Sequence, residues 1–391
     1  MNQVPDRWRY YTPADELERR WKLVCAEMNK QNIDCLVINA YDNMLGGYLR
    51  WFTDIAIADY PVTALFHRSG DITVIGHGGA SGNSVPPPMK RGDWSTPAVA
   101  MMPTLFYTER YVPDIIIKNL KDSGCKKVGY VALTTINSNI YKYMTEELSG
   151  VEFVDATDFV DHIKAVKGPW EIEGIKMVSD LHDKLVMALP SIIRPDKYEY
   201  EVTNDIRRLG ADLGSECVIN VSIGADPNKP HKMLLPWQYR RLQNGDKMFC
   251  LIEFNGPGGQ YSEALRTVVL GEPPQDYVTA AADAESCLKM LISMMKPGVK
   301  CSDLFKANNE YLTALGYFPE ERLFGHGQGY DMVERPALVP AETMSLVENM
   351  HLCVHPGAVN EKVMGFACSN FLITKDGCEQ ITKAPNGLVV C

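Results

Sequence analysis

The sequence predicts two domains, an α/β domain over residues 1–165 and an α+β domain over residues 166–391. Its 391 residues exceed the usual size of a single hydrophobic core. In the first part, apolar β-rich runs alternate with helical patterns, which is typical of an α/β domain. At Gly168-Pro169 a strand and loop pattern changes into a long helical pattern, so we place the domain boundary close to this point.

The first domain is predicted to begin with an amphipathic helix over residues 13–30. Thr12 and Pro13 have the residue types of an N-cap and of a first helical position. Apolar side chains then recur on one helical face, at Leu17, Trp21, Val24, Cys25 and Met28. Short β-rich runs predict strands at residues 34–40, 60–67, 72–76, 127–132 and 151–154.

The second domain is predicted to mix long helices with strands. Helical patterns occur at residues 170–190, 199–213, 275–295 and 302–315, the last with Ser302 as its cap and Gly316 at its end. Strand patterns lie between them, at residues 216–223, 247–255, 260–270, 350–358 and 366–375.

Composition and charge narrow the classes of partner. The chain has 46% apolar and 23% charged residues, as in ordered globular proteins. A formal net charge of −10 disfavours nucleic acid and anionic membranes, which would be repelled. The N-terminal residues are charged where a signal peptide needs an apolar core, and no run approaches the ~18 apolar residues of a membrane span. We expect a cytoplasmic protein with its eleven cysteines reduced.

Four local patterns in the second domain contain side chains that can do chemistry. The first is GADPNKPHKMLLP at residues 224–236, which contains His231 and precedes a Gly-Asp turn. The second is a hairpin pattern at residues 251–271, LIEFNGPGGQYSEALRTVVLG. The third is FGHGQGYDMVERP at residues 324–336, and the fourth joins MHLCVHPGAVN to FACSNFLITKDGCEQIT within residues 350–382.

Together these patterns resemble the creatinase, prolidase and aminopeptidase P family. The resemblance spans about residues 170–391 and implies the pita-bread fold for the second domain and a creatinase-like first domain. His231 takes the position of the family's loop histidine, and Glu263 that of an aspartate in an Asp-x-x-Arg-Thr pattern. His326 matches the histidine of the HGxG motif, and His355 and Cys368 stand where two glutamates belong.

The chain departs from this family at the metal ligands. The family binds two ions with two Asp, one His and two Glu, of which only His326 is unchanged here; Glu253 is the acid nearest to the first Asp position. Imidazole and thiolate cannot bridge two ions as a carboxylate does. We therefore expect no metal cofactor, with one zinc ion held by His326, His355, Cys368 and Glu263 as the alternative.

The resemblance to creatinase, which hydrolyses a C–N bond without metal, implies roles for two histidines. His231 would be the general acid and base, because histidine titrates near neutral pH. His326 would orient or polarise the substrate, since two glycines beside it allow a ligand to approach the backbone closely.

The substrate would be a small molecule, possibly a cation. Glu253, Glu263 and Glu334 would make the pocket acidic, with His355 and Cys368 as further substrate-binding groups. Arg266 and Arg335 would pair with these glutamates or bind a substrate carboxylate. Plain structural roles are open for three of these positions: Cys368 as a buried thiol, His355 as a turn cap, and Glu334 with Arg335 as an ion pair.

A homodimer is expected from the segment YLRWF at residues 48–52, which resembles the segment before a loop that creatinase-like proteins send into the neighbouring subunit's site. Where creatinase has a substrate-binding aromatic residue and an arginine, this chain has Ile57, Ala58, Asp59 and Tyr60. Asp59 is therefore the candidate substrate-binding residue of that loop. Without a basic residue there, creatine is a poor candidate substrate.

The predicted function is metal-independent hydrolysis of a C–N bond in a small non-peptide substrate. Three alternatives stay open. One is a lyase in which His231 or Tyr261 removes a proton from carbon. Another is a metal-dependent Xaa-Pro-type peptidase with an altered zinc site. The third is a binding protein without catalysis, which the retention of costly buried polar groups disfavours.

Overall fold

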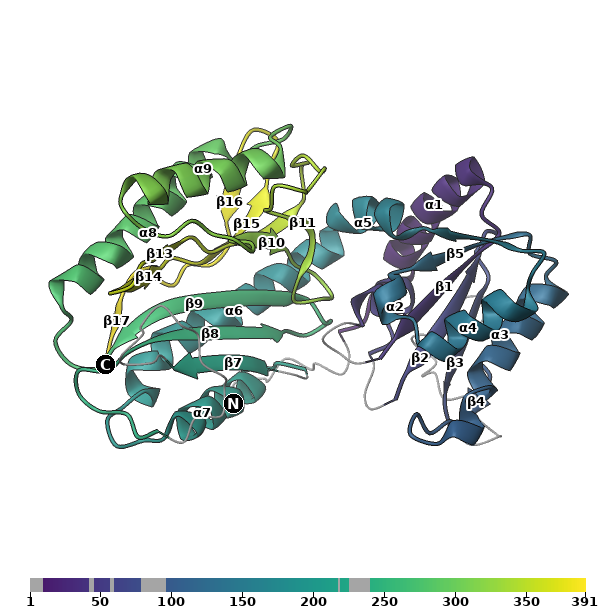
Figure 1. Cartoon of the computed structure of the whole chain (residues 1–391), viewed down its shortest axis with the longest axis horizontal. Coiled ribbons are helices and arrows are strands. Elements are labelled where there is room, and N and C mark those ends of the chain that lie inside the picture. Colours follow the sequence, from purple (N-terminus) through teal and green to yellow (C-terminus); the bar gives the residue numbers. More distant parts are fainter. Residues whose placement is uncertain (1–9, 42–45, 57–59, 79–95, 217–218, 225–239) are drawn as a thin grey trace. The chain divides into compact units, whose positions relative to one another are not determined.

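The computed structural model of the chain describes residues 10–41, 46–56, 60–78, 96–216, 219–224 and 240–391. These residues form two compact units, Tyr11–Lys164 and Ala165–Cys391 (Figure 1). Tyr10 belongs with the second unit, where its ring stacks on Trp170 with 4.2 Å between ring centroids. The predicted site residues His231 and Asp59 lie outside the described residues.

The first unit is an α/β domain with one six-stranded sheet in the order β4-β3-β2-β1-β5-β6. Strands β1, β5 and β6 run parallel, whereas β2 is antiparallel to β1 and β3. The strands are β1 (Cys35–Ala40), β2 (Val62–His67), β3 (Ile72–His77), β4 (Ala98–Val99), β5 (Lys127–Val131) and β6 (Glu152–Asp155). The helices are α1 (Ala14–Gln31), α2 (Gly47–Thr53), α3 (Tyr111–Asp122), α4 (Ser138–Glu147) and α5 (Thr157–Ala165).

Helices cover both faces of this sheet. Apolar side chains of α3 and α4, such as Ile116 and Met144, pack on one face against Val37 and Leu65. On the other face Phe66 contacts the rings of α1 and α2. The alternating side-chain directions of each strand therefore bury both faces, and the predicted α/β class is confirmed.

The first helix begins one residue later than predicted. Pro13 has an extended backbone and is the N-cap, and helix α1 starts at Ala14. Thr12 does not cap the helix, because its backbone N–H and its hydroxyl both donate to the carboxylate of Asp54, over 2.8 and 2.7 Å. A partner this distant in the sequence cannot be seen in the local pattern.

The second unit has the α+β architecture that the sequence predicts. One sheet has the order β17-β9-β8-β7, another β11-β10-β12-β15-β16, and β13 pairs with β14. The strands of the four-stranded sheet are β7 (Ile219–Gly224), β8 (Lys247–Asn255), β9 (Tyr261–Val269) and β17 (Val389–Val390). The remaining strands are β10 (Gly325–Gly327), β11 (Glu334–Ala337), β12 (His351–Val354), β13 (Gly357–Val359), β14 (Met364–Phe366), β15 (Ser369–Ile373) and β16 (Cys378–Gln380).

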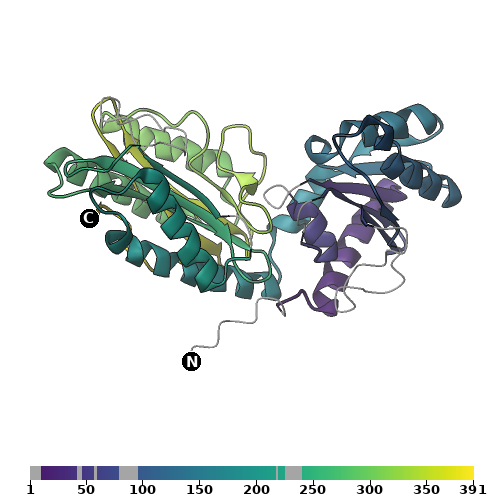
Figure 2. The ribbon, with the colours of Figure 1, turned by 90° about the horizontal axis from the view of Figure 1, so that it is seen from below.

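Two pairs of helices enclose these sheets. Helices α6 (Pro169–Ile192) and α7 (Glu199–Leu213) pack against β9 and β7, and α8 (Gln275–Met294) with α9 (Cys301–Ala314) covers the other side. Figure 2 shows the teal α6 and α7 lying across the face of the four-stranded sheet. Strand β9 contacts β14 and β15, so the sheets pack on one another around a single apolar core.

Two predicted elements of this unit differ in detail. The strand expected at residues 350–358 is two strands, β12 and β13, separated at Pro356, which has no N–H to continue a ladder. The last long helix starts at Cys301 with Lys300 as its N-cap, not with Ser302. Gly316, at a φ of 87°, follows its end as expected.

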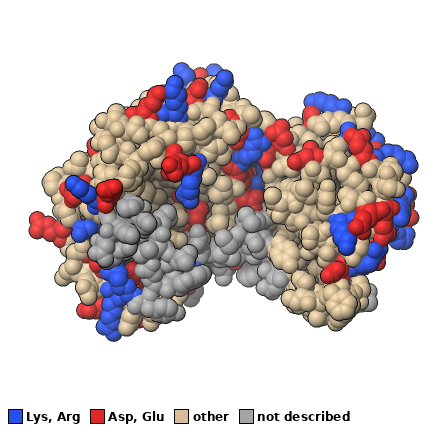
Figure 3. All heavy atoms as spheres, viewed as in Figure 1, with Lys and Arg blue, Asp and Glu red and all other residues tan. Residues whose placement is uncertain are grey.

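Acidic and basic side chains are interspersed over both units on the face drawn in Figure 3. No described helix is long and apolar enough to cross a membrane. The expected cytoplasmic location and the exclusion of nucleic-acid and membrane partners stay predictions.

Candidate active site

The candidate site is built from strands of the two larger sheets of the second unit. On β8 and β9, Glu253 lies directly opposite Glu263, so both side chains share one face of that sheet. In the other sheet, His326 of β10 lies opposite Cys353 of β12, which lies opposite Asn370 of β15. The side-chain amide of Asn370 donates to the backbone carbonyl of Glu263 over 2.7 Å, so the two sheets meet here.

Glu263 is at the centre of the site and contacts two histidines. Its carboxylate is 3.3 Å from Nε2 of His326 and 3.9 Å from Nε2 of His355, and the two imidazole rings are 5.5 Å apart between centroids. Nδ1 of His326 donates to the backbone carbonyl of Gly327 over 2.9 Å, which turns Nε2 toward the carboxylate. The structure thus brings together three of the predicted site residues.

The charges at this centre follow from burial and from the contacts. Burial raises the pKa of the Glu263 carboxyl, but the imidazoles of His355 and His326 outweigh it, and the pKa lies below its usual value. Burial lowers the pKa of His326, but Glu263 outweighs this effect and raises it. At His355 burial prevails and the pKa is lowered. The contacts thus favour the carboxylate form of Glu263 and the imidazolium form of His326, whereas burial favours the neutral form of His355.

The variant Glu263→Gln should change how stability depends on pH. In the wild type, the raised pKa of His326 gives stability that is fully present below the unfolded pKa of about 6.5 and is lost as pH rises through the folded pKa. In the variant the strongest group that raises the pKa of His326 is lost, and only the Gly327 carbonyl and Glu253 still oppose the effect of burial, so protonation of His326 contributes less to folding. We expect a loss of roughly 1–3 kcal/mol in unfolding free energy near pH 6 that narrows toward pH 9, measured by urea unfolding.

The control for this experiment is Glu253→Gln, which alters the carboxyl group on the adjacent strand. Glu253 raises the pKa of His326 less than Glu263 does, so the pH-dependent part of its effect should be smaller. Parallel stability curves for Glu263→Gln and wild type would contradict the ion pair.

Two thiols lie next to the carboxylate, one of which the sequence analysis missed. Sγ of Cys353 is 3.6 Å from Sγ of Cys368, and Sγ of Cys368 is 3.8 Å from the backbone carbonyl of Glu263. Burial raises the pKa of Cys353 well above its usual value, so this group is a thiol at neutral pH. Cys353 could have been found from the sequence, because it lies two residues before His355 and residues two apart on a strand share a face.

Glu334 and Arg335 each have a partner within the protein. The ammonium of Lys167 is 2.7 Å from the carboxylate of Glu334, and both side chains are buried. The guanidinium of Arg335 is 2.6 Å from the carboxylate of Glu342. Glu334 thus pairs with Lys167, and Arg335 pairs with Glu342. A role in substrate binding for Glu334 and Arg335 stays a prediction.

Arg266 has a structural role that corrects the expected one. Its guanidinium is buried and donates to backbone carbonyls, those of Leu265, Cys368, Ala384 and Pro385. It pairs with no carboxylate among the described residues. The expectation that it pairs with the glutamates of the site is wrong, because the carbonyls of a distant segment use its donors.

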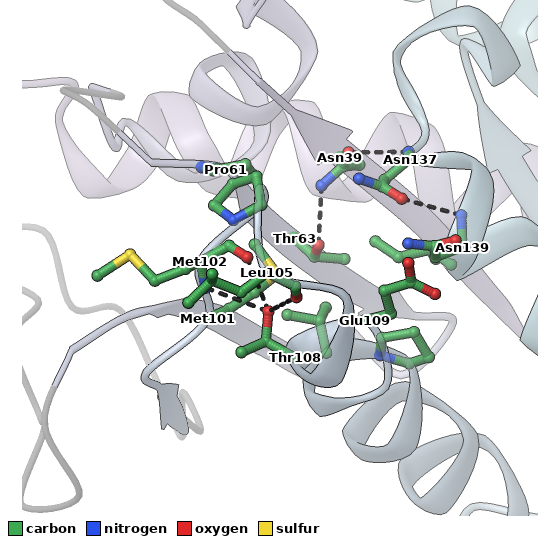
Figure 4. A pocket seen from close by; sticks show the side chains of 14 residues that line it. Asn39, Pro61, Thr63, Met101, Met102, Leu105, Thr108, Glu109, Asn137 and Asn139 are labelled. Atoms are coloured by element: carbon green, nitrogen blue, oxygen red, sulfur yellow. Dashed lines mark hydrogen bonds between the residues drawn. The ribbon is translucent and has the colours of Figure 1, made fainter.

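A small pocket in the first unit has both apolar and polar lining residues (Figure 4). Its volume is about 30 Å³, and Asn39, Thr63 and Asn137 line it. The side-chain amide of Asn39 donates to the hydroxyl of Thr63 over 2.9 Å and accepts from the backbone N–H of Asn137. These polar groups satisfy one another, and the pocket has room for little more than a water molecule.

Comparison with known proteins identifies the family. The sequence profile of metallopeptidase family M24 matches residues 173–376, which is more than half of the chain. The chain belongs to metallopeptidase family M24. The predicted resemblance to the creatinase and prolidase superfamily is thereby confirmed.

Individual relatives of this M24 protein match to different extents. It is 26% identical over 247 residues to a probable dipeptidase PepE of Mycobacterium tuberculosis, covering 62% of this chain and 64% of the dipeptidase. It is 25% identical over 419 residues to an ectoine hydrolase of Halomonas elongata, covering 97% and 98%. The X-Pro aminopeptidase structure from Thermotoga maritima is similar in fold, with a TM-score of 0.78, 18% identity and coverage of 95% and 99%.

The described residues of this M24 protein do not supply the ligands of a dinuclear metal centre. The donor groups that lie close enough together are Glu263, His326 and His355, and Glu263, Cys353 and Cys368. Glu263 supplies the carboxylate in both groups, so within the described chain these sets lack the several bridging oxygens that two ions require. The donors of the first group are types that a single zinc ion accepts.

Proposed function

We propose that this M24 protein hydrolyses a C–N bond in a small non-peptide substrate without a metal cofactor. The observation that carries the proposal is the Glu263–His326 contact. The Glu263 carboxylate, at a ligand position of the family, lies 3.3 Å from Nε2 of His326 and raises the pKa of this histidine, which favours its imidazolium form. A charged pair of this kind provides fixed electrostatics in a water-poor site.

The full-length similarity to a hydrolase of a small molecule supports the same proposal. The ectoine hydrolase aligns over nearly the whole of both chains, whereas the dipeptidase aligns over 64% of its own length. Identity near 25% leaves the substrate open, and ectoine is therefore the first compound to assay rather than an assignment.

In the proposed mechanism, one histidine transfers protons and the other stabilises charge. His231 removes a proton from the attacking water and returns a proton to the leaving nitrogen. The imidazolium of His326 places a positive charge beside the reacting carbon and stabilises the negative charge that develops on the substrate. We also propose a cytoplasmic homodimer in which Asp59 completes the partner subunit's site.

The metal content of the purified protein tests this proposal. We expect well under one equivalent of manganese, cobalt or iron, and turnover that is unchanged by chelators, because the donor set lacks bridging carboxylates. The measurement is elemental analysis combined with an ectoine hydrolysis assay before and after EDTA treatment. Two equivalents of metal, removed together with activity, would contradict the proposal and indicate a metallopeptidase.

One equivalent of zinc would favour a second candidate function. Glu263, His326 and His355 offer donor atoms within 4.8 Å of one another, a set that a mononuclear zinc hydrolase could use. Product analysis in oxygen-18 water separates hydrolysis, which incorporates the label, from elimination, which need not. Ligand binding without any product would instead indicate a binding protein.

A further inference from the structure

Buried polar atoms without partners lie close to the Glu263–His326 centre. Gln328 is 0% exposed, and neither its amide oxygen nor its amide nitrogen has a hydrogen-bond partner among the described residues. His351 is 1% exposed, and its Nε2 atom also has none there. Buried polar groups in folded proteins are nearly always hydrogen-bonded, and leaving them unpaired destabilises the fold. Two such residues side by side therefore indicate a binding site for a ligand.

Gln328 and His351 lie on the face of the sheet that carries His326. Gly327 lies opposite Leu352 in the β10–β12 ladder, so the next position of β10, Gln328, comes opposite His351. The backbone N–H of Gln328 donates to the carbonyl of His351 over 3.4 Å, which agrees with this register. Residues two apart on a strand share a face and are about 7 Å apart. Gln328 and His351 thus lie next to the Glu263–His326 centre, on the same face of the sheet as His326.

The hydrogen bonds of His351 determine what it offers to a ligand. Its Nδ1 is 3.2 Å from the backbone carbonyl of Gln328, and because a carbonyl can only accept, Nδ1 carries the proton. In a neutral imidazole whose proton is on Nδ1, the other nitrogen, Nε2, is an acceptor. The amide of Gln328 adds a second acceptor and a donor.

This combination of groups selects a chemical class. A ligand that satisfies both residues must donate at least one hydrogen to Nε2 of His351 and must accept one from the amide of Gln328. A carboxylate has no hydrogen to donate to His351, and a simple ammonium ion cannot accept from Gln328. A carboxamide or lactam that carries an N–H has a donor beside an acceptor in one plane and matches both requirements.

We propose that Gln328 and His351 form a subsite that binds a planar amide group of the substrate, two residues along the strand from the Glu263–His326 centre. This subsite rests on the proposed function, because it places a C–N group beside the histidines that would hydrolyse it. It adds the substrate class that the family resemblance leaves open.

Gln260 provides a matched control within the same unit. It is 2% exposed, and both of its amide atoms also lack partners among the residues that the structure describes. It packs against helix α6 instead, since a Cβ atom built on Gly174 would be 3.0 Å from Cγ of Gln260. Replacing either glutamine with methionine removes an unpaired amide at nearly constant volume, but only Gln328 belongs to the proposed subsite.

The experiment measures binding in the wild type and in Gln328→Met, His351→Leu and Gln260→Met. The probes are N-acetylglycinamide, acetamide and 2-pyrrolidinone, in which an amide N–H lies beside a carbonyl oxygen, with acetate and methylammonium as comparison ions. Calorimetry gives the dissociation constants, and thermal melting gives the stability of the ligand-free proteins. We expect at least one of the first three probes to bind the wild type, and Gln328→Met and His351→Leu to weaken that binding at least tenfold. Gln260→Met should bind as the wild type does.

A second measurement keeps the test independent of folding defects in the variants. In the wild-type protein, the ¹⁵N resonance of His351 Nε2 should shift when the probe binds, because the bare nitrogen gains a hydrogen bond. An unshifted resonance, equal affinity in Gln328→Met, an equal loss in Gln260→Met, or no binding of any probe would each overturn the subsite. Hydrolysis of a probe with unchanged affinity in Gln328→Met would retain the proposed function and reject the subsite. Binding that depends on Gln328 without hydrolysis would do the reverse.

Discussion

The variant His231→Asn is expected to lower turnover by roughly 10²- to 10⁴-fold while its unfolding free energy stays near that of the wild type. The groups that the structure describes at the centre of the site leave proton transfer to another residue. The contact between Glu263 and His326 lowers the pKa of the carboxyl and raises that of the imidazole, so each group stabilises the charged form of the other. A base that works at neutral pH needs a pKa near 7, which an unperturbed histidine has.

The comparison variant for this experiment is His355→Asn. His355 is the neutral histidine of the centre, and burial lowers its pKa, which makes it a weaker base than an unperturbed histidine. Steady-state rates across pH 5–9 distinguish the two residues. If His231 is the base, His231→Asn loses the rise in rate near neutral pH, whereas His355→Asn retains it at a lower rate. An active, well-folded His231→Asn enzyme would remove His231 from the mechanism.

The fold was predictable because each motif marks one local element. The HGQG pattern falls on β10, and the acid of the Glu-x-x-Arg-Thr pattern falls on β9. The contacts of Glu263 with His326 and His355 are not local, because they arise where strands distant in the sequence come together. No local pattern contains that pairing, and only the resemblance to a known family predicted it.

Other parts of the site could be found only once the strand register was known. In the segment HLCVH, alternation places His351, Cys353 and His355 on one face, and the same argument relates Gln328 to His326. The sequence alone does not show that this face is the inner one. The partner of Arg266 was predicted wrongly for a related reason, because three of the four carbonyls to which it donates, those of Cys368, Ala384 and Pro385, belong to a segment more than 100 residues away.

Lys167 shows the limit of sequence analysis most clearly and gives the largest expected effect on stability. Its partner Glu334 is 167 residues away, and no motif relates the two. Their side chains are 2% and 4% exposed, and the backbone N–H of Asp331 also donates to the Glu334 carboxylate over 3.0 Å. Gly329 lies against the pair, since a Cβ atom there would be 2.6 Å from Nζ of Lys167.

The variant Lys167→Met should lower the unfolding free energy by about 3–5 kcal/mol, because it leaves the Glu334 carboxylate buried without this ammonium. The double variant Lys167→Met/Glu334→Gln should recover much of that loss, since replacing both charges removes the uncompensated one. The control is Lys306→Met, which breaks the exposed pair of Lys306 with Glu310, 73% and 67% exposed, and should change stability by less than about 1 kcal/mol. Urea unfolding followed by circular dichroism measures all three variants. If Lys167→Met is no less stable than Lys306→Met, or if the double variant is as unstable as Lys167→Met, the buried pair is not what holds Glu334 in place.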